Sequence, residues 1–182
     1  MKTRDANDHR PLLLMAQDEG RFGRLSRPHA CWSPPGVRPL APSQFVREAM
    51  YAFTAVAPSI GELCSLVLPH ANTAMMNLFL GHVSSTFSQY FIVMQVDQAG
   101  WHCAKALIIP ENMRLIAQPP YSPELNPVEH IWEELREKYF YNRVFPSLES
   151  LTDVLCLALN TLAGDQQRVK SMTNFPHLQI VF

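Results

Sequence analysis

The feature that most constrains the fold of this chain is the nearly continuous apolar run at residues 89–96, which ends on Asp97. Such a run is typical of a central strand covered on both faces, because a strand with one wet face alternates apolar and polar residues. A strand covered on both faces needs helices on both sides of its sheet. The run therefore predicts a layered α/β domain.

The other periodic segments fit this layered arrangement. Further strands are predicted at 11–17, 51–56, 62–68 and 113–118, and helices at 73–83, 101–109, 127–140 and 147–162. The short connection at 58–61 predicts a hairpin between the second and third strands, and the later strands alternate with helices, as in β-α-β crossovers. We therefore expect a central mixed five-stranded sheet flanked by helices.

Length and composition bound the domain organisation. The 182 residues are 47% hydrophobic and 17% charged, which fits one folded domain and excludes a disordered chain. We expect a flexible N-terminal segment at 1–10, a folded domain at 11–165 with an irregular basic insertion at 20–47, and a C-terminal tail at 166–182. The start of the chain lacks the apolar core of a signal peptide, and no apolar run approaches the ~20 residues that span a bilayer. A cytoplasmic protein with no membrane partner is expected.

The cysteines and histidines offer no recognisable metal site. The four cysteines form no C-x-x-C pair and no zinc-finger spacing, which favours idle thiols in a reducing compartment. No two of the seven histidines lie four residues apart, as a metal-binding pair on one helix face would. The sequence therefore argues against a metal site built from histidine or cysteine.

The basic residues are unevenly distributed. The net charge of −1 argues mildly against a dedicated nucleic-acid binder. The segment 20–47, however, contains no acidic residue and interleaves its cations with aromatic side chains. This pattern suits a loop that contacts backbone phosphates and stacks on an exposed base; a solvated loop anchored by a few aromatic residues explains it equally well. The candidate DNA-binding residues are Arg21, Arg24, Arg27, Trp32 and Arg38.

Three acidic residues come at positions where the predicted elements could bring them together. Asp18 and Asp97 each directly follow a predicted strand, and Glu129 lies in the first turn of the helix that follows the proline-rich stretch 119–127. Carboxylate oxygens are the ligands that Mg²⁺ and Mn²⁺ prefer, and neighbouring carboxylates repel each other unless a cation lies between them. Three such acids could hold two metal ions about 3.5–4 Å apart, which is the arrangement that supports phosphodiester chemistry.

Each of these acids also has an ordinary structural interpretation. Asn126 is a good N-cap and Glu129 is then the third helical residue, so the pair could form a capping box. Acids that end strands are common turn formers. The secondary candidates for the site are Glu19, His102, Asn126 and Glu133. Glu133 lies one turn after Glu129 and repels it unless a cation is bound.

Four stretches of the chain together resemble DDE transposases, in particular the bacterial insertion-sequence branch of the mariner-like superfamily. The stretches are DEGRFG at 18–23, WSPPGVRP at 32–39, DQAGWH at 97–102 and PPYSPELNPVEHIW at 119–132. The resemblance implies an RNase H-like fold and a catalytic triad of Asp18, Asp97 and Glu129 that binds Mg²⁺ or Mn²⁺. Two departures are Gln98, where many relatives have asparagine, and a short interval of 31 residues between the last two acids.

The resemblance also implies a reaction and its partners. The reaction is metal-dependent cleavage of DNA at the ends of a mobile element, followed by transfer of the freed strand into target DNA. Relatives carry a helix-turn-helix region before the catalytic domain, whereas only 17 residues precede Asp18. We therefore expect that region on a separate partner, with a homodimer as a further possibility and a nucleoid-associated location. Two alternatives remain: a catalytically silent transposase remnant that only associates with DNA or transposase, and a stand-alone RNase H-like nuclease.

Overall fold

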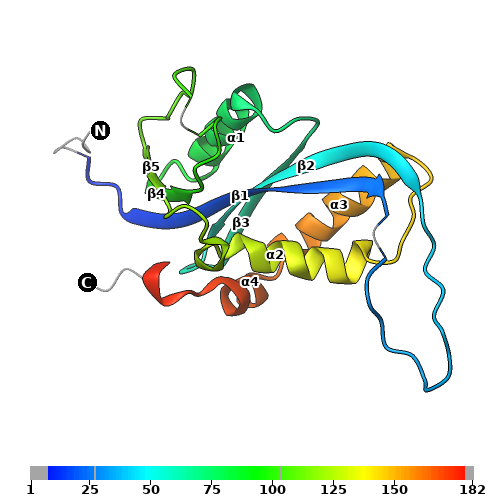
Figure 1. Cartoon of the computed structure of the whole chain (residues 1–182). Coiled ribbons are helices and arrows are strands. Elements are labelled where there is room, and N and C mark those ends of the chain that lie inside the picture. Colours follow the sequence, from blue (N-terminus) through cyan, green and yellow to red (C-terminus); the bar gives the residue numbers. More distant parts are fainter. Residues whose placement is uncertain (1–7, 27, 103, 179–182) are drawn as a thin grey trace.

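A five-stranded mixed sheet forms the centre of the molecule, as the sequence predicts (Figure 1). The computed structural model describes residues 8–26, 28–102 and 104–178. The strand order is β3-β2-β1-β4-β5, in which β1, β2 and β3 pair antiparallel while β4 pairs parallel to both β1 and β5. The strands are β1 (Leu12–Leu25), β2 (Phe45–Ala57), β3 (Glu62–Leu68), β4 (Phe91–Val96) and β5 (Met113–Ala117).

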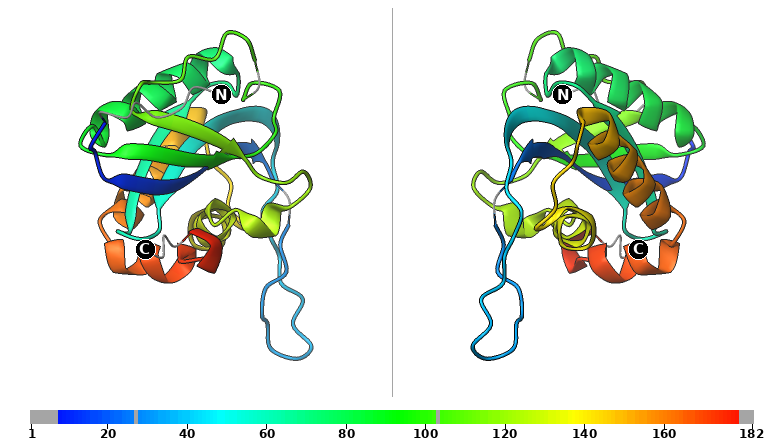
Figure 2. Two further views of the ribbon diagram at one scale, coloured as in Figure 1. Left: turned by 90° about the vertical axis from the view of Figure 1, so that its left-hand side faces the viewer. Right: turned by 90° about the vertical axis from the view of Figure 1, so that its right-hand side faces the viewer.

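Helices cover both faces of the sheet, as the apolar run in β4 predicts (Figure 2). They are α1 (Thr73–Thr86), α2 (Val128–Leu135) with a π-helical extension η2 (Arg136–Phe140), α3 (Leu148–Ala163) and α4 (Gln166–Thr173), with short 3-10 turns η1 (Pro123–Leu125) and η3 (Pro176–Leu178). The helix α1 packs on one face, and α2, α3 and α4 pack on the other. None of the helices in the described part of the chain combines the length and apolarity needed to cross a membrane.

The alternation of side chains along β1 separates the two cores. Leu13 and Met15 point into the core beneath α1, whereas Ala16 and Phe22 point into the core beneath α2, α3 and α4. This is the period of two that a strand imposes on its side chains. Residues of β1 with the same parity as Ala16 therefore face α2.

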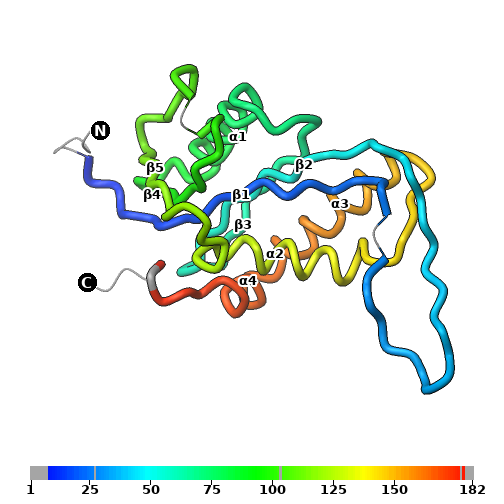
Figure 3. Tube along the Cα trace, in the orientation of Figure 1, coloured from blue at the N-terminus to red at the C-terminus, as the bar shows by residue number. Residues whose placement is uncertain are grey.

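Two predicted boundaries are wrong, because long-range pairing outweighs the local signal. The irregular segment is 26–44 rather than 20–47, since β1 and β2 continue in antiparallel register through Gly20↔Ala52 and Gly23↔Ala49 despite the glycines. This segment, which we call the arm, extends away from the rest of the chain (Figure 3). Arg21 and Arg24 consequently lie in a strand.

The predicted helix at 101–109 is also wrong, because its described residues form turns. The side chain of Asn77 in α1 bonds to the carbonyl of Ala106 and the amide of Ile108, and so satisfies backbone groups that a helix would have paired. At the other end of the chain, α4 occupies part of the predicted tail, capped by the side chain of Asp165. Residues 1–7 and 179–182 lie outside the described residues, so the flexible segment 1–10 and the end of the tail at 166–182 stay predictions.

We predict that Gly20→Ala destabilises the fold. A Cβ at this position would lie 2.8 Å from the ring of Phe22 and 2.9 Å from the ring of Trp132, and overpacking of this kind costs about 1–3 kcal/mol. The free energy of unfolding in urea should fall by that amount. As a control, Gly81→Ala in α1, where a Cβ would meet no atom within 4 Å, should raise stability by about 1 kcal/mol. Equal stability of the two variants would contradict the packing described for Gly20.

Candidate active site

The parallel pairing of β1 and β4 places Asp18 and Asp97 side by side. Ala16 pairs with Gln95, and two residues further along each strand come the two aspartates. The prediction that the strand ends before Asp18 is wrong, because Asp18 is itself a strand residue. It lies within β1, paired to Thr54 of β2, at the point where β1 has lost β4 as a neighbour. The edge of the sheet is therefore open where the two aspartates lie.

The three predicted acids line one open cleft of about 520 Å³. Asp18 comes from β1, Asp97 from the end of β4 and Glu129 from the first turn of α2. The rest of the wall comes from the stretch 118–123, from Gln98 and Ala99 after β4, and from Asn126 before α2. The structure thus brings together three carboxylates that the sequence separates widely, while their chemical role stays a prediction.

Asp18 is held by two donors and is unfavourable to ionise. Its Oδ2 accepts a hydrogen bond of 3.0 Å from Nε1 of Trp132, and its Oδ1 accepts one of 2.9 Å from the backbone amide of Glu19. Burial raises the pKa of Asp18 to about 6, and the charges of Glu129 and Glu19 add to this, while the Trp132 bond opposes it. At neutral pH, a bound cation would offset the unfavourable negative charge of ionised Asp18.

Asp97 has the opposite electrostatic environment. Its Oδ1 lies 2.7 Å from Nδ1 of His102 and accepts a bond of 2.9 Å from the amide of Ala99. The hydrogen bond from His102 lowers the pKa of Asp97, against the effect of partial burial. Asp97 is therefore a fixed, ionised carboxylate at the cleft.

His102 links Asp97 to Glu19 on β1. Its Nε2 lies 3.0 Å from Oε1 of Glu19, and the two side chains are only 1% and 5% exposed. Burial lowers the pKa of His102, but the hydrogen bonds to Asp97 and Glu19 outweigh it and raise the pKa to about 10. Because both ring nitrogens face carboxylates, both donate, and the ring is an imidazolium. Gln17 also donates a hydrogen bond to Glu19. Glu19 therefore has two side-chain partners, and it is not among the residues that line the cleft.

Glu129 does not form the predicted capping box. The amide of Asn126 bonds to the carbonyl of Pro123, while the Asn126 side chain accepts from the amide of Val128 and donates to the carbonyl of Gln17 in β1. Among the described residues, the Glu129 carboxylate has no hydrogen-bond or ion-pair partner. It therefore remains available at the cleft, where Asn126 fixes the start of its helix against β1.

The secondary candidate Glu133 lies outside the cleft. Its side chain is exposed one turn further along α2, and it is absent from the residues that line the cavity. Trp132, to which the sequence analysis gave no role, is a residue of the site that it missed, because its indole N–H donates to Asp18. An indole N–H three residues after Glu129 lies on the same helix face, so its spacing was a usable signal for a partner of Asp18.

The chemistry of the donor set fits a hard divalent cation. The three side chains supply only oxygen ligands, the Glu129 carboxylate has no partner among the described residues, and the nearby charges of Glu129 and Glu19 disfavour the ionisation of Asp18. The three carboxylates line one cleft, but within the described residues no three His, Cys, Asp or Glu side chains stand close enough to hold a metal ion by themselves. Mg²⁺ usually keeps several waters and binds through one or two carboxylates plus substrate phosphates, so a site of this kind would need water and phosphate ligands as well.

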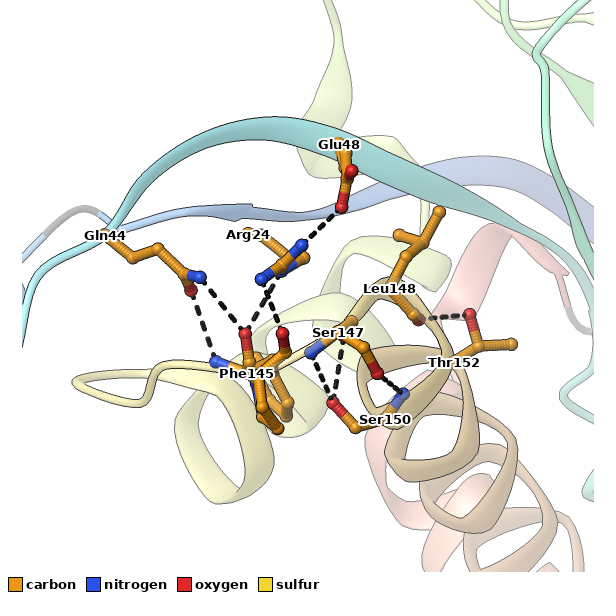
Figure 4. A network of polar contacts seen from close by, with 9 residues as sticks. Arg24, Gln44, Glu48, Phe145, Ser147, Leu148, Ser150 and Thr152 are labelled. Carbon is orange, nitrogen blue, oxygen red and sulfur yellow. Dashed lines mark hydrogen bonds and ion pairs between the residues drawn. The ribbon is translucent and has the colours of Figure 1, made fainter.

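The predicted DNA-binding residues are dispersed. The guanidinium of Arg24 bonds to the carboxylate of Glu48 and to the carbonyls of Phe145 and Pro146, which anchors the loop before α3 (Figure 4). Trp32 and Arg38 are exposed on the arm. Arg21 is exposed on β1, and Arg27 lies outside the described residues.

An α/β domain with three carboxylates at one open cleft defines a class of metal-dependent nucleases. The sequence of residues 14–152 matches the family described as DDE superfamily endonuclease. The chain belongs to this family, and membership implies the use of divalent metal ions.

Known relatives support the same placement. The uncharacterized protein y4pE/y4sA of Sinorhizobium fredii (strain NBRC 101917 / NGR234) is 36% identical over 123 residues, which cover 67% of this chain and 91% of that protein. The structure of the Mos1 mariner paired end complex with Mn is similar with a TM-score of 0.63 at 14% identity, covering 93% of this chain and 56% of that chain. The Mos1 strand transfer complex gives 0.61 at 15% identity, covering 90% and 55%. The RNase H-like fold is thereby confirmed, and the chain spans a little over half the length of the Mos1 chains.

We predict that Asp18→Asn stabilises the metal-free protein at alkaline pH. The folded pKa of about 6 lies above the usual 3.8, so ionised Asp18 costs folding free energy that appears as the pH rises through 3.8 to 6 and is complete above 6. A shift of this size corresponds to about 3 kcal/mol at most. Urea unfolding in EDTA should show Asp18→Asn more stable than wild type at pH 8 and equal to it near pH 4. The exposed Asp153→Asn serves as a control, and a loss of stability at pH 8 in Asp18→Asn would refute the assignment.

A second prediction concerns the imidazolium of His102. Its folded pKa of about 10 lies above the usual 6.5, so the stabilisation that it provides is complete below pH 6.5 and is lost as the pH rises towards 10. Unfolding measured from pH 6.5 to 10 should show wild-type stability falling by a few kcal/mol. In His102→Gln this slope should largely disappear, whereas exposed His82→Gln should keep it. The same slope in all three proteins would show that His102 is neutral.

Proposed function

We propose that this chain is the catalytic domain of a DNA transposase that cuts DNA at the ends of a mobile element and transfers the freed strand into target DNA. In this proposal Asp18, Asp97 and Glu129 hold two Mg²⁺ or Mn²⁺ ions. The observation that carries the proposal is that these three carboxylates, from β1, the end of β4 and α2, line one open cleft in a chain of the DDE endonuclease family.

The side chains around the acids prepare them for this chemistry. When bound, the ions activate a water or a 3′-hydroxyl and stabilise the leaving oxygen of the phosphodiester. Trp132 and the amide of Glu19 orient Asp18, while His102 and the amide of Ala99 orient Asp97. These donors keep both aspartates in fixed rotamers, which is what a preorganised site requires.

The wall of the cleft offers a surface for DNA. Tyr121 lies there fully exposed, with a left-handed φ of 56° and prolines on both sides at Pro120 and Pro123. A bulky residue in this backbone region is uncommon and marks functional loops. An exposed ring in the lining of the cleft suits stacking on a base.

The exposed DNA-binding candidates on β1 and on the arm are proposed as further DNA contacts. Arg21, Arg38 and Trp32 are exposed and accessible to a DNA backbone or base, and Arg27 completes the proposed set. Arg24 contributes through the loop that it anchors. The Mos1 structures are complexes that include a paired end complex with a left transposon end, which supports DNA binding and assembly of more than one chain here. Recognition of the element ends would then rest on a helix-turn-helix partner.

A matched pair of variants on α2 tests the proposal. Glu129→Gln should lower Mn²⁺-dependent cleavage by more than about 100-fold, because it removes a proposed metal ligand, whereas Glu133→Gln one turn further should cleave normally. Asp97→Ala should likewise abolish strand transfer. The assay uses duplexes from the DNA that flanks the gene beside unrelated duplexes, and circular dichroism checks the fold of each variant.

The metal can be followed separately from the reaction. Mn²⁺ should raise the Tm of wild type and of Glu133→Gln but not of Glu129→Gln, because only ligand binding to the folded state gives this shift. Cleavage of all duplexes without preference for the flanking DNA would favour the stand-alone nuclease. Undetectable cleavage by wild type in either metal would favour the silent remnant, and equal cleavage by Glu129→Gln would overturn the triad.

A further inference from the structure

A second cavity, of about 470 Å³, lies beyond the acids where β1 meets the end of α2 and the base of the arm. We call it the arginine pocket, because Arg21, Arg136 and Arg143 line it. No aspartate or glutamate is among its lining residues. Nothing in the triad chemistry described above requires this cavity.

The three arginines have no acidic partner that neutralises their charge among the described residues. Among the described residues none of them has an ion pair, and the guanidinium of Arg136 lies 5.6 Å from the ring centroid of Phe22 as its one ring contact. Like charges around one concavity repel, and an anion bound between them removes that repulsion. Guanidinium groups match phosphate oxygens bidentately, which makes phosphate the fitting anion.

The pocket is also built to keep its shape. His29 of the arm stacks on Tyr141 with ring centroids 3.8 Å apart and an 8° angle between the planes. The side chain of Asn142 bonds to both the amide and the carbonyl of His29, at 2.9 and 3.0 Å, while its own backbone takes a φ of 55°. Gln44 at the base of the arm bonds in both directions to the backbone of Phe145 (Figure 4). These contacts join the arm to the loop after α2.

The pocket and the cleft lie along the same two elements. From Glu129 to Arg136 the chain advances seven residues, or about 10 Å at 1.5 Å per helical residue. From Asp18 to Phe22 it advances four residues, or about 13 Å along a strand. Duplex DNA rises about 3.4 Å per base pair, so this separation corresponds to about three or four base pairs.

We infer that the arginine pocket binds a backbone phosphate of the DNA strand whose scissile bond lies in the cleft, about three or four nucleotides away. The inference rests on the proposed function, because the distance in nucleotides is counted from a scissile bond bound in the cleft. A phosphate bound there, between the arginines and the stacked rings of His29 and Tyr141, holds the DNA strand in line with the three acids of the cleft. Phosphate contacts of this kind position DNA without reading its sequence.

The test is the salt dependence of DNA binding by the double variant Arg136→Gln/Arg143→Gln. Fluorescence anisotropy with a 30-base-pair duplex should show about tenfold weaker binding near 0.15 M salt. The slope of log K against log salt should shrink by about 1, as for the loss of one phosphate contact. The control Lys105→Gln/Lys170→Gln removes two exposed charges outside both cavities and should keep the wild-type slope. Circular dichroism and urea unfolding exclude loss of the fold.

The outcomes separate the pocket from the triad. If the wild-type protein cleaves DNA but the salt slopes of the two double variants are equal, the phosphate site in the pocket is overturned while the proposed function stands. A slope smaller by about 1 in the pocket variant, together with undetectable cleavage by wild type, would support the phosphate site and overturn the proposed catalytic function in favour of the silent remnant. Inorganic phosphate distinguishes the source: if millimolar phosphate raises the Tm of wild type alone and the DNA slopes stay equal, the pocket takes a free phosphate, and the assignment to a DNA strand is wrong.

Discussion

The site depends on one packing contact, between Trp132 of α2 and β1. The indole is fully buried against the sheet, Gly20 leaves the space that it occupies, and its N–H donates to Asp18. Burying a side chain of this size is worth on the order of 2–3 kcal/mol. Because Glu129 lies three residues earlier on the same helix face, the burial of Trp132 also carries this carboxylate to the edge where Asp18 lies. Apolar packing thus stabilises a grouping of like charges that electrostatics opposes.

The surroundings of the two aspartates shift their pKa values in opposite directions. Burial, together with the charges of Glu129 and Glu19, raises the pKa of Asp18, whereas a hydrogen bond from the imidazolium of His102 lowers the pKa of Asp97. Divergent environments for neighbouring acids are typical of sites that perform chemistry. The net excess of negative charge at the cleft agrees with the divalent metal that membership of the DDE endonuclease family implies.

Much of the architecture could be predicted, because its signals are local. The run at 89–96 predicted a strand covered on both faces, and the connection at 58–61 predicted the hairpin, whose strands pair from Ala57↔Glu62 onward. The limits of the basic insertion could not be predicted, since the glycines and arginines at 20–25 are held in a strand by the register with β2. The helix expected at 101–109 failed for a similar reason, because Asn77 of α1 takes over its backbone groups.

The sequence by itself determined the order of the five strands, the covering of the sheet on both faces, and the placement of three acids near strand ends and a helix start. Only the tertiary structure decided what those acids touch. The bond from Trp132 to Asp18 spans 114 positions, and the bridge from His102 to Glu19 spans 83. Side-chain periodicity and capping are set by a few adjacent residues. Contacts across such distances exist only once strand register and helix packing have fixed which faces meet.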